Sequence, residues 1–357
     1  MFSKRSIIAA ASLACAASLA QAQISDGVVK IGVLSDMSSL YSDIAGSGST
    51  VAARMAVEDF GAARKGMKVE ILSADHLNKP DVGSSIARQW YDVDKVDVIV
   101  DVPTSSIALA INQITREKGK AFLVSGADYA FGLALERDTE AVVLKNGGKV
   151  LGKVRHPLNA QDFSSFLLQA QASKAKIVGL ANAGGDTTNS IKQAAEFGIV
   201  KGGQSLAGML VFISDIHGLG LDKAQGLIFT ETFYWDLNDQ TRAFAKRFAA
   251  ANSGKYPTMV QAGVYSAITH YLKAVQAGKT DDGTKVIAKM KELPTEDPLF
   301  GKGTVRADGR KLHPAYLVEV KKPSESKGPY DYYKIRATIP VDQAFRPMNE
   351  GGCSLVK

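Results

Sequence analysis

The stretch VKIGVLSD, residues 29–36, decides the fold class. Val29, Ile31 and Val33 alternate as they do in a strand, and the apolar residues from Val51 to Phe60 then recur at helical spacing. A short strand followed by an amphipathic helix is the unit from which parallel sheets with crossover helices are built. We therefore expect an α/β protein.

The same alternation continues for about two hundred residues and then stops. Because the 357 residues exceed one typical domain of about 100–200, we expect two lobes, with a change of lobe where three helices follow one another. Further strands are expected at 69–72, 96–102, 121–124, 150–154, 177–180, 206–213, 227–229, 316–320 and 332–335, and the consecutive helices at 241–251, 260–277 and 284–293.

The N-terminal residues predict secretion. Lys4 and Arg5 precede an apolar run over residues 7–20, which ends in the small-x-small pattern of residues 20–22. A membrane anchor is the alternative, but the run is shorter than the ~20 residues that a spanning helix needs. Lipidation at Cys15 is a weaker option. We interpret residues 1–22 as a cleaved signal peptide and expect the mature protein in the periplasm.

The formal charge of +7 does not indicate a nucleic-acid partner. Basic residues are spread along the chain in brief groups, such as Lys321 and Lys322, rather than gathered in a stripe with aromatic residues. The five histidines lack ligand spacing, so no metal is expected. No cofactor is expected either.

Catalytic signatures are absent from the sequence. It contains no G-x-S-x-G elbow, Walker A loop, G-x-G-x-x-G or H-E-x-x-H. A Ser-His-Asp triad could assemble from distant residues, but a chain of this length always contains the ingredients. A secreted hydrolase on a similar fold stays open as the least favoured alternative.

Polar loops follow several of the expected strands, where open α/β sheets bind ligands. Their hydroxyl and amide groups could fix a polar ligand head, and their aromatic rings could enclose an apolar part. Helix capping explains most of them equally well. The aromatic residues of 231–236 are harder to explain that way, unless they meet a ligand or another lobe. The loops are residues 36–41, 103–106, 125–127, 182–186 and 231–236.

Four motifs give the chain a resemblance to a known family. They are VKIGVLSDMS at 29–38, AVEDF at 56–60, DYAFG at 128–132 and QAGVYSA at 261–267. Together they resemble the leucine/isoleucine/valine-binding branch of ABC-transporter substrate-binding proteins. The resemblance implies a periplasmic binding protein of type I: two Rossmann-like lobes with parallel sheets, a cleft that closes on a ligand, and no enzymatic activity. It also implies membrane permease subunits as partners and a monomeric state.

The resemblance also implies which residues bind the ligand. In relatives the matching loops of the first lobe hydrogen-bond the ligand's carboxylate or amide, and Phe131 stands where relatives often have tyrosine. The ligand class stays open among branched-chain amino acids, amides and aromatic acids. The expected ligand-binding residues are Ser39, Tyr41, Thr104, Ser105, Ser106, Ser125, Gly126, Ala127, Phe131, Asn182, Asp186, Ser214, Asp215, Glu231, Phe233 and Tyr234.

One departure from the family lies between Ala127 and Asp128. Relatives continue there through a cysteine-containing loop, a first lobe crossing, a helix and a strand, all of which are missing here. The family thus suggests that Cys353 has lost its partner. We expect the first lobe to comprise 24–127 and about 238–312, and a shortened second lobe 128–237 and about 313–357. A damaged, inactive relative is therefore an alternative to a working binding protein, since a lost strand would leave a sheet edge open.

Overall fold

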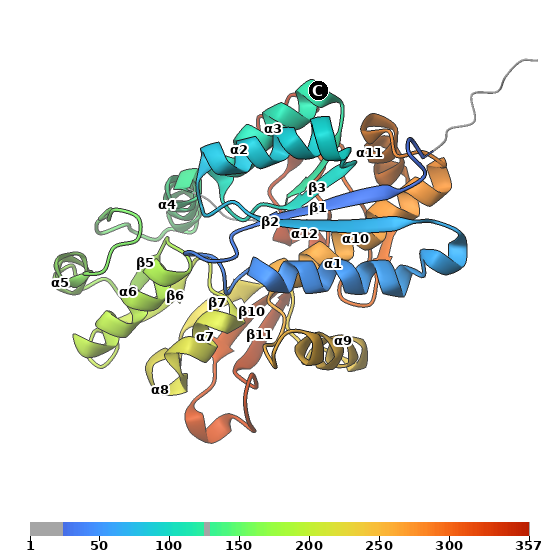
Figure 1. The fold of residues 1–357 in the computed structure, drawn as a ribbon. Coiled ribbons are helices and arrows are strands. Elements are labelled where there is room, and N and C mark those ends of the chain that lie inside the picture. The colour runs from blue at the N-terminus through green and yellow to red at the C-terminus, as the bar shows by residue number, and fades with distance from the viewer. Residues whose placement is uncertain (1–23, 125–128, 357) are drawn as a thin grey trace, which may run out of the picture.

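The protein is described by a computed structural model that covers residues 24–124 and 129–356. Two sheets, each with helices packed against it, form two lobes (Figure 1). We name the lobe around the four-stranded sheet the first lobe and the one around the five-stranded sheet the second. The expected signal peptide and the expected site residues Ser125, Gly126 and Ala127 lie outside the described residues. None of the helices in the described ranges is both long and apolar enough to cross a membrane.

The first lobe contains a fully parallel sheet with the strand order β2-β1-β3-β4. Ile31 and Val33 of β1 point into one core, whereas Leu34 points into the core on the opposite face, as a pleated strand requires. This two-sided burial explains the nearly continuous apolar sequences of β1 and β3. The strands are β1 (Val29–Ser35), β2 (Val69–Asp75), β3 (Val98–Asp101) and β4 (Ala121–Val124).

Helices cover both faces of this sheet (Figure 1). On one face α2 and α3 pack on Leu34 and Ile99, and on the other α1 and α10 pack with α9 and α11. Helices α9, α10 and α11 are the three consecutive helices expected from the sequence. The bounds are α1 (Gly46–Phe60), α2 (Pro80–Gln89), α3 (Ser105–Lys118), α9 (Asp239–Ala251), α10 (Met259–Gly278) and α11 (Gly283–Glu292), with a small hairpin, β8 (Thr295–Asp297) and β9 (Gly301–Gly303), after them.

Two of the motifs that carry the family resemblance contact each other between α1 and α10. The Tyr265 hydroxyl donates to Asp59 Oδ2 at 2.9 Å, and Arg247 of α9 forms an ion pair with the same carboxylate. Gln261 donates from Nε2 to the Ala45 carbonyl at 2.9 Å, just before α1. These residues therefore fix the helices that support the loop after β1.

The second lobe contains a mixed sheet with the order β11-β10-β7-β6-β5. Strands β5, β6 and β7 are parallel, as expected, whereas β10 runs antiparallel to both β7 and β11, so the second sheet also contains antiparallel pairs. The bounds are β5 (Ile177–Leu180), β6 (Ser205–Gly208), β7 (Ile228–Glu231), β10 (Ala315–Val320) and β11 (Tyr333–Ile339), and the helices are α4 (Tyr129–Lys145), α5 (Ser164–Ala172), α6 (Gly185–Glu196), α7 (Ile213–Leu219), α8 (Leu221–Ala224) and α12 (Val341–Ala344).

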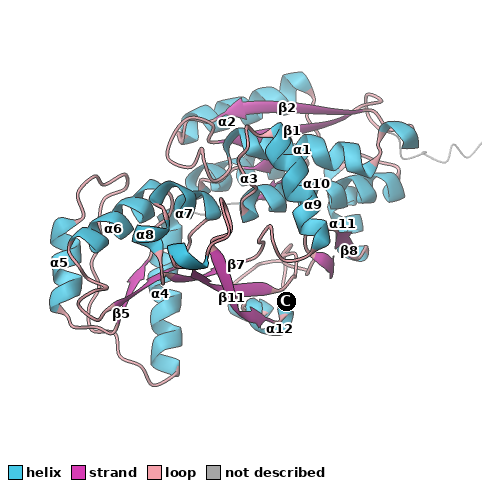
Figure 2. Ribbon diagram, turned by 90° about the horizontal axis from the view of Figure 1, so that it is seen from below, coloured by secondary structure: helices cyan, strands magenta, loops and turns pink. Residues whose placement is uncertain are grey.

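The strand expected at 150–154 does not form. Residues 148–156 have no strand neighbour, and β5 is the last strand of its sheet on that side (Figure 2). Leu151 is consequently 57% exposed, and Val142 of α4 is 60% exposed. A strand needs a partner for its backbone N–H and C=O groups, so an apolar, β-branched sequence alone does not make one.

Candidate functional site

The loop after β1 is organised by the carboxylate of Asp36. This fully buried side chain accepts hydrogen bonds from the backbone N–H groups of Ser39 and Tyr41, both at 2.9 Å, and from the Ser39 hydroxyl at 2.7 Å. Ser39 is exposed and its hydroxyl is engaged with Asp36. Tyr41 is buried and faces the second lobe.

Tyr41 marks a direct contact between the lobes. It belongs to a small apolar cluster with Ala183 of the second lobe and Phe212, which precedes α7. A Cβ atom at Gly184 would lie 3.0 Å from the Leu40 carbonyl oxygen and 3.2 Å from Tyr41 Cδ1. Gly184 also has a φ of +58°, so both its backbone and its neighbours favour glycine. The loops after β1 and β5 are thus pressed together.

The loop after β3 begins with strained backbone. Asp101 and Val102 have φ values of +78° and +60°, which for a β-branched residue is a rare conformation. Strain of this kind collects at functional sites. Thr104 is buried and donates from its hydroxyl to Asn78 Oδ1 at 2.7 Å, Ser105 is half-buried, and Ser106 is exposed. The Thr104 hydroxyl is therefore already engaged within the first lobe.

Three expected residues lie at the end of β7 and in the helix that follows the neighbouring strand β6: Glu231 is the last residue of β7, and Ser214 and Asp215 belong to the first turn of α7. Glu231 is 1% exposed; the Tyr333 hydroxyl donates to its Oε1 at 3.3 Å, and Oε2 has no hydrogen-bond partner. The Ser214 hydroxyl is likewise buried without a partner. Asp215 accepts the backbone N–H of Phe212 at 2.9 Å. This region therefore offers unsatisfied buried polar atoms, which are costly unless something binds them.

Burial shifts the pKa values of the two acids in this region, Asp215 and Glu231. Burial raises the pKa of Asp215 to about 7, opposed by the Phe212 N–H and assisted by the charge of Asp43. Burial also raises the pKa of Glu231 well above its ordinary value, and the nearby Asp215 adds to that rise. Strongly perturbed carboxyl groups are a feature of functional sites.

Phe233 and Tyr234 lie where the chain crosses between the lobes. Phe233 packs on Phe244 and Phe300 in the core of the first lobe. Tyr234 packs on Tyr333 in the core of the second lobe, and its hydroxyl donates to the Tyr330 carbonyl. Both rings therefore contact protein, and each anchors the crossing to one lobe.

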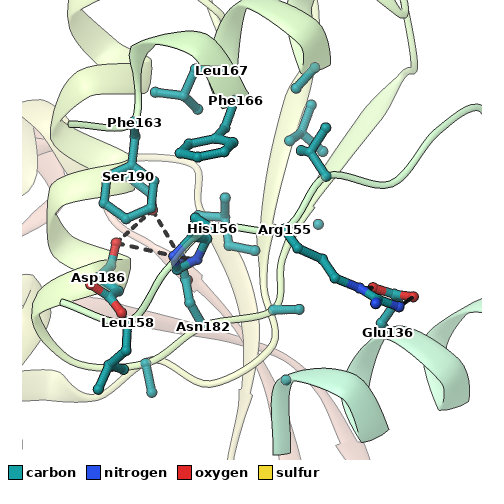
Figure 3. Close-up of a pocket in the computed structure, with 18 of the residues that line it drawn as sticks. Glu136, Arg155, His156, Leu158, Phe163, Phe166, Leu167, Asn182, Asp186 and Ser190 are labelled. Atoms are coloured by element: carbon teal, nitrogen blue, oxygen red, sulfur yellow. Dashed lines mark hydrogen bonds and ion pairs between the residues drawn. The ribbon is translucent and has the colours of Figure 1, made fainter. Parts of the chain in front are cut away.

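A cavity of about 260 Å³ lies in the second lobe between β5, α4 and the segment that fails to form a strand (Figure 3). Of the expected site residues, it is lined by Tyr41, Asn182 and Asp186. Asp186 is 3% exposed, and burial raises its pKa. Phe131 belongs to α4, but its side chain lies outside what the structure describes.

The expected residues thus divide into separate groups. Glu231 ends β7, and Ser214 and Asp215 lie in α7 after the neighbouring strand β6. Tyr41, Asn182 and Asp186 line the cavity, and the loop of Thr104–Ser106 belongs to the first lobe. Sequence reasoning missed the roles of Asp36 and His156. An acid directly after the first strand was a usable signal for Asp36, whereas nothing local marked His156 as a cavity residue. Within 24–124 and 129–356, no group of three metal-ligating side chains could hold an ion.

Comparisons with known proteins identify the family. The sequence matches the periplasmic binding protein family over residues 28–127 and 115–329. A periplasmic binding protein from Burkholderia mallei is 46% identical, with 93% of this chain and 100% of that one covered and a TM-score of 0.88. A branched chain amino acid ABC transporter periplasmic ligand-binding protein from Burkholderia xenovorans LB400 is 39% identical, with 92% and 100% covered and a TM-score of 0.81.

A more distant structure shares the fold alone. It is an ABC-transporter solute-binding protein from R. palustris solved with 4-hydroxybenzoate, 20% identical, with 88% and 97% covered and a TM-score of 0.75. No curated protein matches the chain. The matched length and the identity to the first two relatives show that this chain belongs to the periplasmic binding protein family.

Proposed function

We propose that this protein is the extracytoplasmic solute-binding component of an ABC importer, and that it binds a small organic ligand with an N–H donor between its lobes. The family binds ligands without converting them. The observation that carries the ligand assignment is Glu231, whose buried Oε2 has no partner at the end of β7; Ser214, in the helix that follows the neighbouring strand β6, has an equally unpartnered hydroxyl. A ligand ammonium or amide group would satisfy Glu231 Oε2.

This donor preference selects among the ligand classes that the sequence left open. A branched-chain amino acid carries an ammonium group and an amide carries N–H groups, but an aromatic acid without nitrogen would bring its carboxylate toward two buried acids. The name of the Burkholderia xenovorans relative also favours a branched-chain amino acid. We therefore place amino acids and their amides before aromatic acids.

Binding requires the lobes to separate and close again. Tyr41 and Gly184 now touch across the junction, and Glu231 is buried, so a ligand reaches Glu231 only after the structure opens. The crossing that contains Phe233 and Tyr234 joins two cores, and rotation about this crossing would open the junction as a hinge. Closure would then bury the ligand under the loops of both lobes.

The family implies a periplasmic location, and we extend this to a cleaved signal peptide at residues 1–22 and to a monomer that docks on permease subunits. The charged N-terminal residues followed by a short apolar run support export. The family alone supports the permease partners and the monomeric state.

We also propose that a strand and a helix are missing between Ala127 and Asp128. The first segment of the family match ends at residue 127, β5 is left at the sheet edge, and residues 150–154 form no strand. These observations favour one second candidate, a member of the family that has lost binding. A binding measurement separates the two.

Isothermal titration calorimetry with leucine, leucinamide and 4-methylpentanoate tests the proposal, because the three share a side chain and differ in nitrogen. We expect leucine and leucinamide to bind and the acid to fail. Glu231→Gln should weaken leucine binding about tenfold or more, since a charge-assisted hydrogen bond is lost. Glu296→Gln, at a side chain 63% exposed, is the matched control and should bind like the wild type. Equal binding of the acid, or no effect of Glu231→Gln, would contradict the proposal.

A further inference from the structure

Three aromatic rings are stacked beside the crossing between the lobes. The ring of Tyr330 is nearly parallel to that of Tyr256, at an angle of 5° with centroids 4.5 Å apart, and to that of His217, at 6° and 4.4 Å. Trp235 contacts Tyr256 edge to face with centroids 4.9 Å apart. Stacked and edge-to-face contacts are the arrangements that aromatic rings favour. We name the rings of Tyr330, Tyr256 and His217 the aromatic stack.

The backbone of Tyr256 is fixed to the first lobe. Tyr256 lies in the connection between α9 and α10. The residue before it, Lys255, forms an ion pair with Asp43 at 3.0 Å, and the buried Thr258 hydroxyl donates to the Ile44 carbonyl at 2.6 Å. Both partners belong to the loop between β1 and α1. The connection that carries Tyr256 is therefore held on this first-lobe loop.

The ring of Tyr256, in contrast, packs against the apolar core of the second lobe. Its stacking partner Tyr330 is a buried member of that core and lies just before β11, and His217 belongs to α7 of the same lobe. Tyr256 itself is half-buried. The aromatic stack consequently joins a side chain anchored in the first lobe to two side chains of the second lobe.

The backbone of Tyr330 adopts a costly conformation. Its φ of +66° lies in the left-handed region, which residues other than glycine rarely adopt. Trp235 donates from Nε1 to the Tyr330 carbonyl at 2.7 Å, and the Tyr332 backbone N–H donates to the same carbonyl at 2.9 Å. Strain of this kind persists only where the surrounding structure enforces it, and it is typical of clamps and switch regions. These hydrogen bonds therefore fix the residue on which the other two rings stack.

Opening of the lobes would separate the two halves of the aromatic stack. Ile44 belongs to the apolar cluster that joins the loop between β1 and α1 to Phe212 of the second lobe. This loop is therefore among those that part when the lobes open, and Tyr256 is held on it through Thr258. Tyr330, in the core of the second lobe, does not move with that loop.

We propose that the aromatic stack is a latch that holds the two lobes closed, and that Tyr256 is a positioning residue which thereby sets the affinity for the solute. This inference rests on the proposed function, since it takes opening and closure of the lobes as the binding mechanism. A contact that forms only in the closed state favours that state, and the apparent affinity falls with the fraction of closed molecules. Loss of the stack should weaken binding through faster dissociation, because a ligand leaves only after the lobes open.

Substitution of Tyr256 in the purified full chain tests the latch. Tyr256→Leu keeps an apolar side chain but removes the ring, and it should raise the dissociation constant for leucine about threefold to tenfold, the range that one aromatic pair supplies. Stopped-flow mixing should show a faster dissociation rate. Small-angle X-ray scattering without leucine should give a larger radius of gyration than for the wild type, because the open state gains population.

Three further variants show whether the effect comes from the stack. Tyr256→Phe keeps the ring and should behave like the wild type in all three measurements. Phe197→Leu removes a ring of the second lobe that is 36% exposed at the end of α6, and this matched control should also behave like the wild type. Tyr330→Leu should weaken leucine binding, and adding Tyr256→Leu to it should weaken binding no further, since both substitutions remove one contact.

Three outcomes would overturn the latch. An unchanged radius of gyration and dissociation rate in Tyr256→Leu, with only a lower free energy of unfolding, would mean that the stack persists in the open state. Equal losses in Tyr256→Phe and Tyr256→Leu would exclude ring stacking as the cause. If the wild type binds no leucine, the proposed ligand class fails, but scattering still decides on the latch: equal radii of gyration for Tyr256→Leu and the wild type would contradict it.

Discussion

Apolar, β-like sequences form paired strands in the first lobe, but in the second lobe one such sequence forms no strand. In the first lobe β1 has a strand on each side and helices on both faces, and β1 and β3 are buried along nearly their whole length. In the second lobe β5 is an edge strand with Ile177 63% exposed, and the next β-like sequence, 150–154, forms no strand. An apolar pattern thus becomes a strand only where a neighbour pairs with it.

The contrast extends to the helices. The helix α10 buries most of its length between other elements, whereas α4 leaves Leu133, Val142 and Leu144 each more than half exposed. Apolar surface that no partner covers contributes little to stability. The same kind of substitution should therefore lower the free energy of unfolding more in the first lobe than in the second.

Truncating one phenylalanine in each lobe should give the largest difference. Phe248→Ala removes a fully buried ring from the first-lobe core and should lower the free energy of unfolding by about 4 kcal/mol. Phe166→Ala removes a half-buried ring that already faces a cavity and should cost about 1 kcal/mol. Urea denaturation of both variants measures the two values. Equal losses would mean that the second lobe is as tightly packed as the first.

The ionisation of Asp215 should make the second lobe sensitive to pH. Its pKa is raised to about 7 in the folded state, so its contribution to stability is fully present below pH 3.8 and is lost as the pH rises through about 7. The loss amounts to at most about 4 kcal/mol. Asp215→Asn keeps an acceptor for the Phe212 N–H but does not ionise. The variant should therefore gain stability relative to the wild type between pH 4 and 8, as measured by denaturation at several pH values. A constant difference across this range would contradict burial as the cause.

The smallest effect is expected on the exposed face of α4. Val142 is 60% exposed and serine has nearly the same helix propensity, so Val142→Ser should change the free energy of unfolding by no more than about 0.5 kcal/mol. Val264→Ser in α10, where valine is 1% exposed, is the matched control and should cost about 2 kcal/mol or more. A large loss at Val142 would show that α4 is covered in solution.

Much of the fold could be predicted from the sequence, because the elements depend on local periodicity. The strands at 121–124 and 177–180 agree with the structure to the residue, and the three consecutive helices agree within about two residues, a typical uncertainty of helix ends. The absence of a strand at 150–154 and the antiparallel direction of β10 could not be predicted, because pairing depends on neighbours far away in the chain. The hairpin of β8 and β9 was missed because each strand is only three residues long.

The candidate site was less accessible to sequence reasoning. Polar segments at the carboxyl ends of the strands indicated a region, and Glu231 does end β7 while Ser214 and Asp215 lie in the helix after the neighbouring strand β6. The Ser39 hydroxyl is already bonded to Asp36 and the Thr104 hydroxyl to Asn78. No pattern in the sequence reveals these pairs, so sequence reasoning could not tell which hydroxyls are already engaged. The cavity beside Asp186 lies where β5 has no outer neighbouring strand, and sequence periodicity does not show whether a neighbouring strand is present.

Thermal unfolding of the purified protein with leucine, leucinamide and 4-methylpentanoate tests most directly the claim that the lobes close on a ligand with an N–H donor. A ligand present at a hundredfold excess over its dissociation constant should stabilise the protein by about 2.7 kcal/mol. We predict one cooperative transition that leucine and leucinamide shift upward and the acid does not. A transition that none of the three shifts, a shift with the acid alone, or no cooperative transition at all would contradict the account.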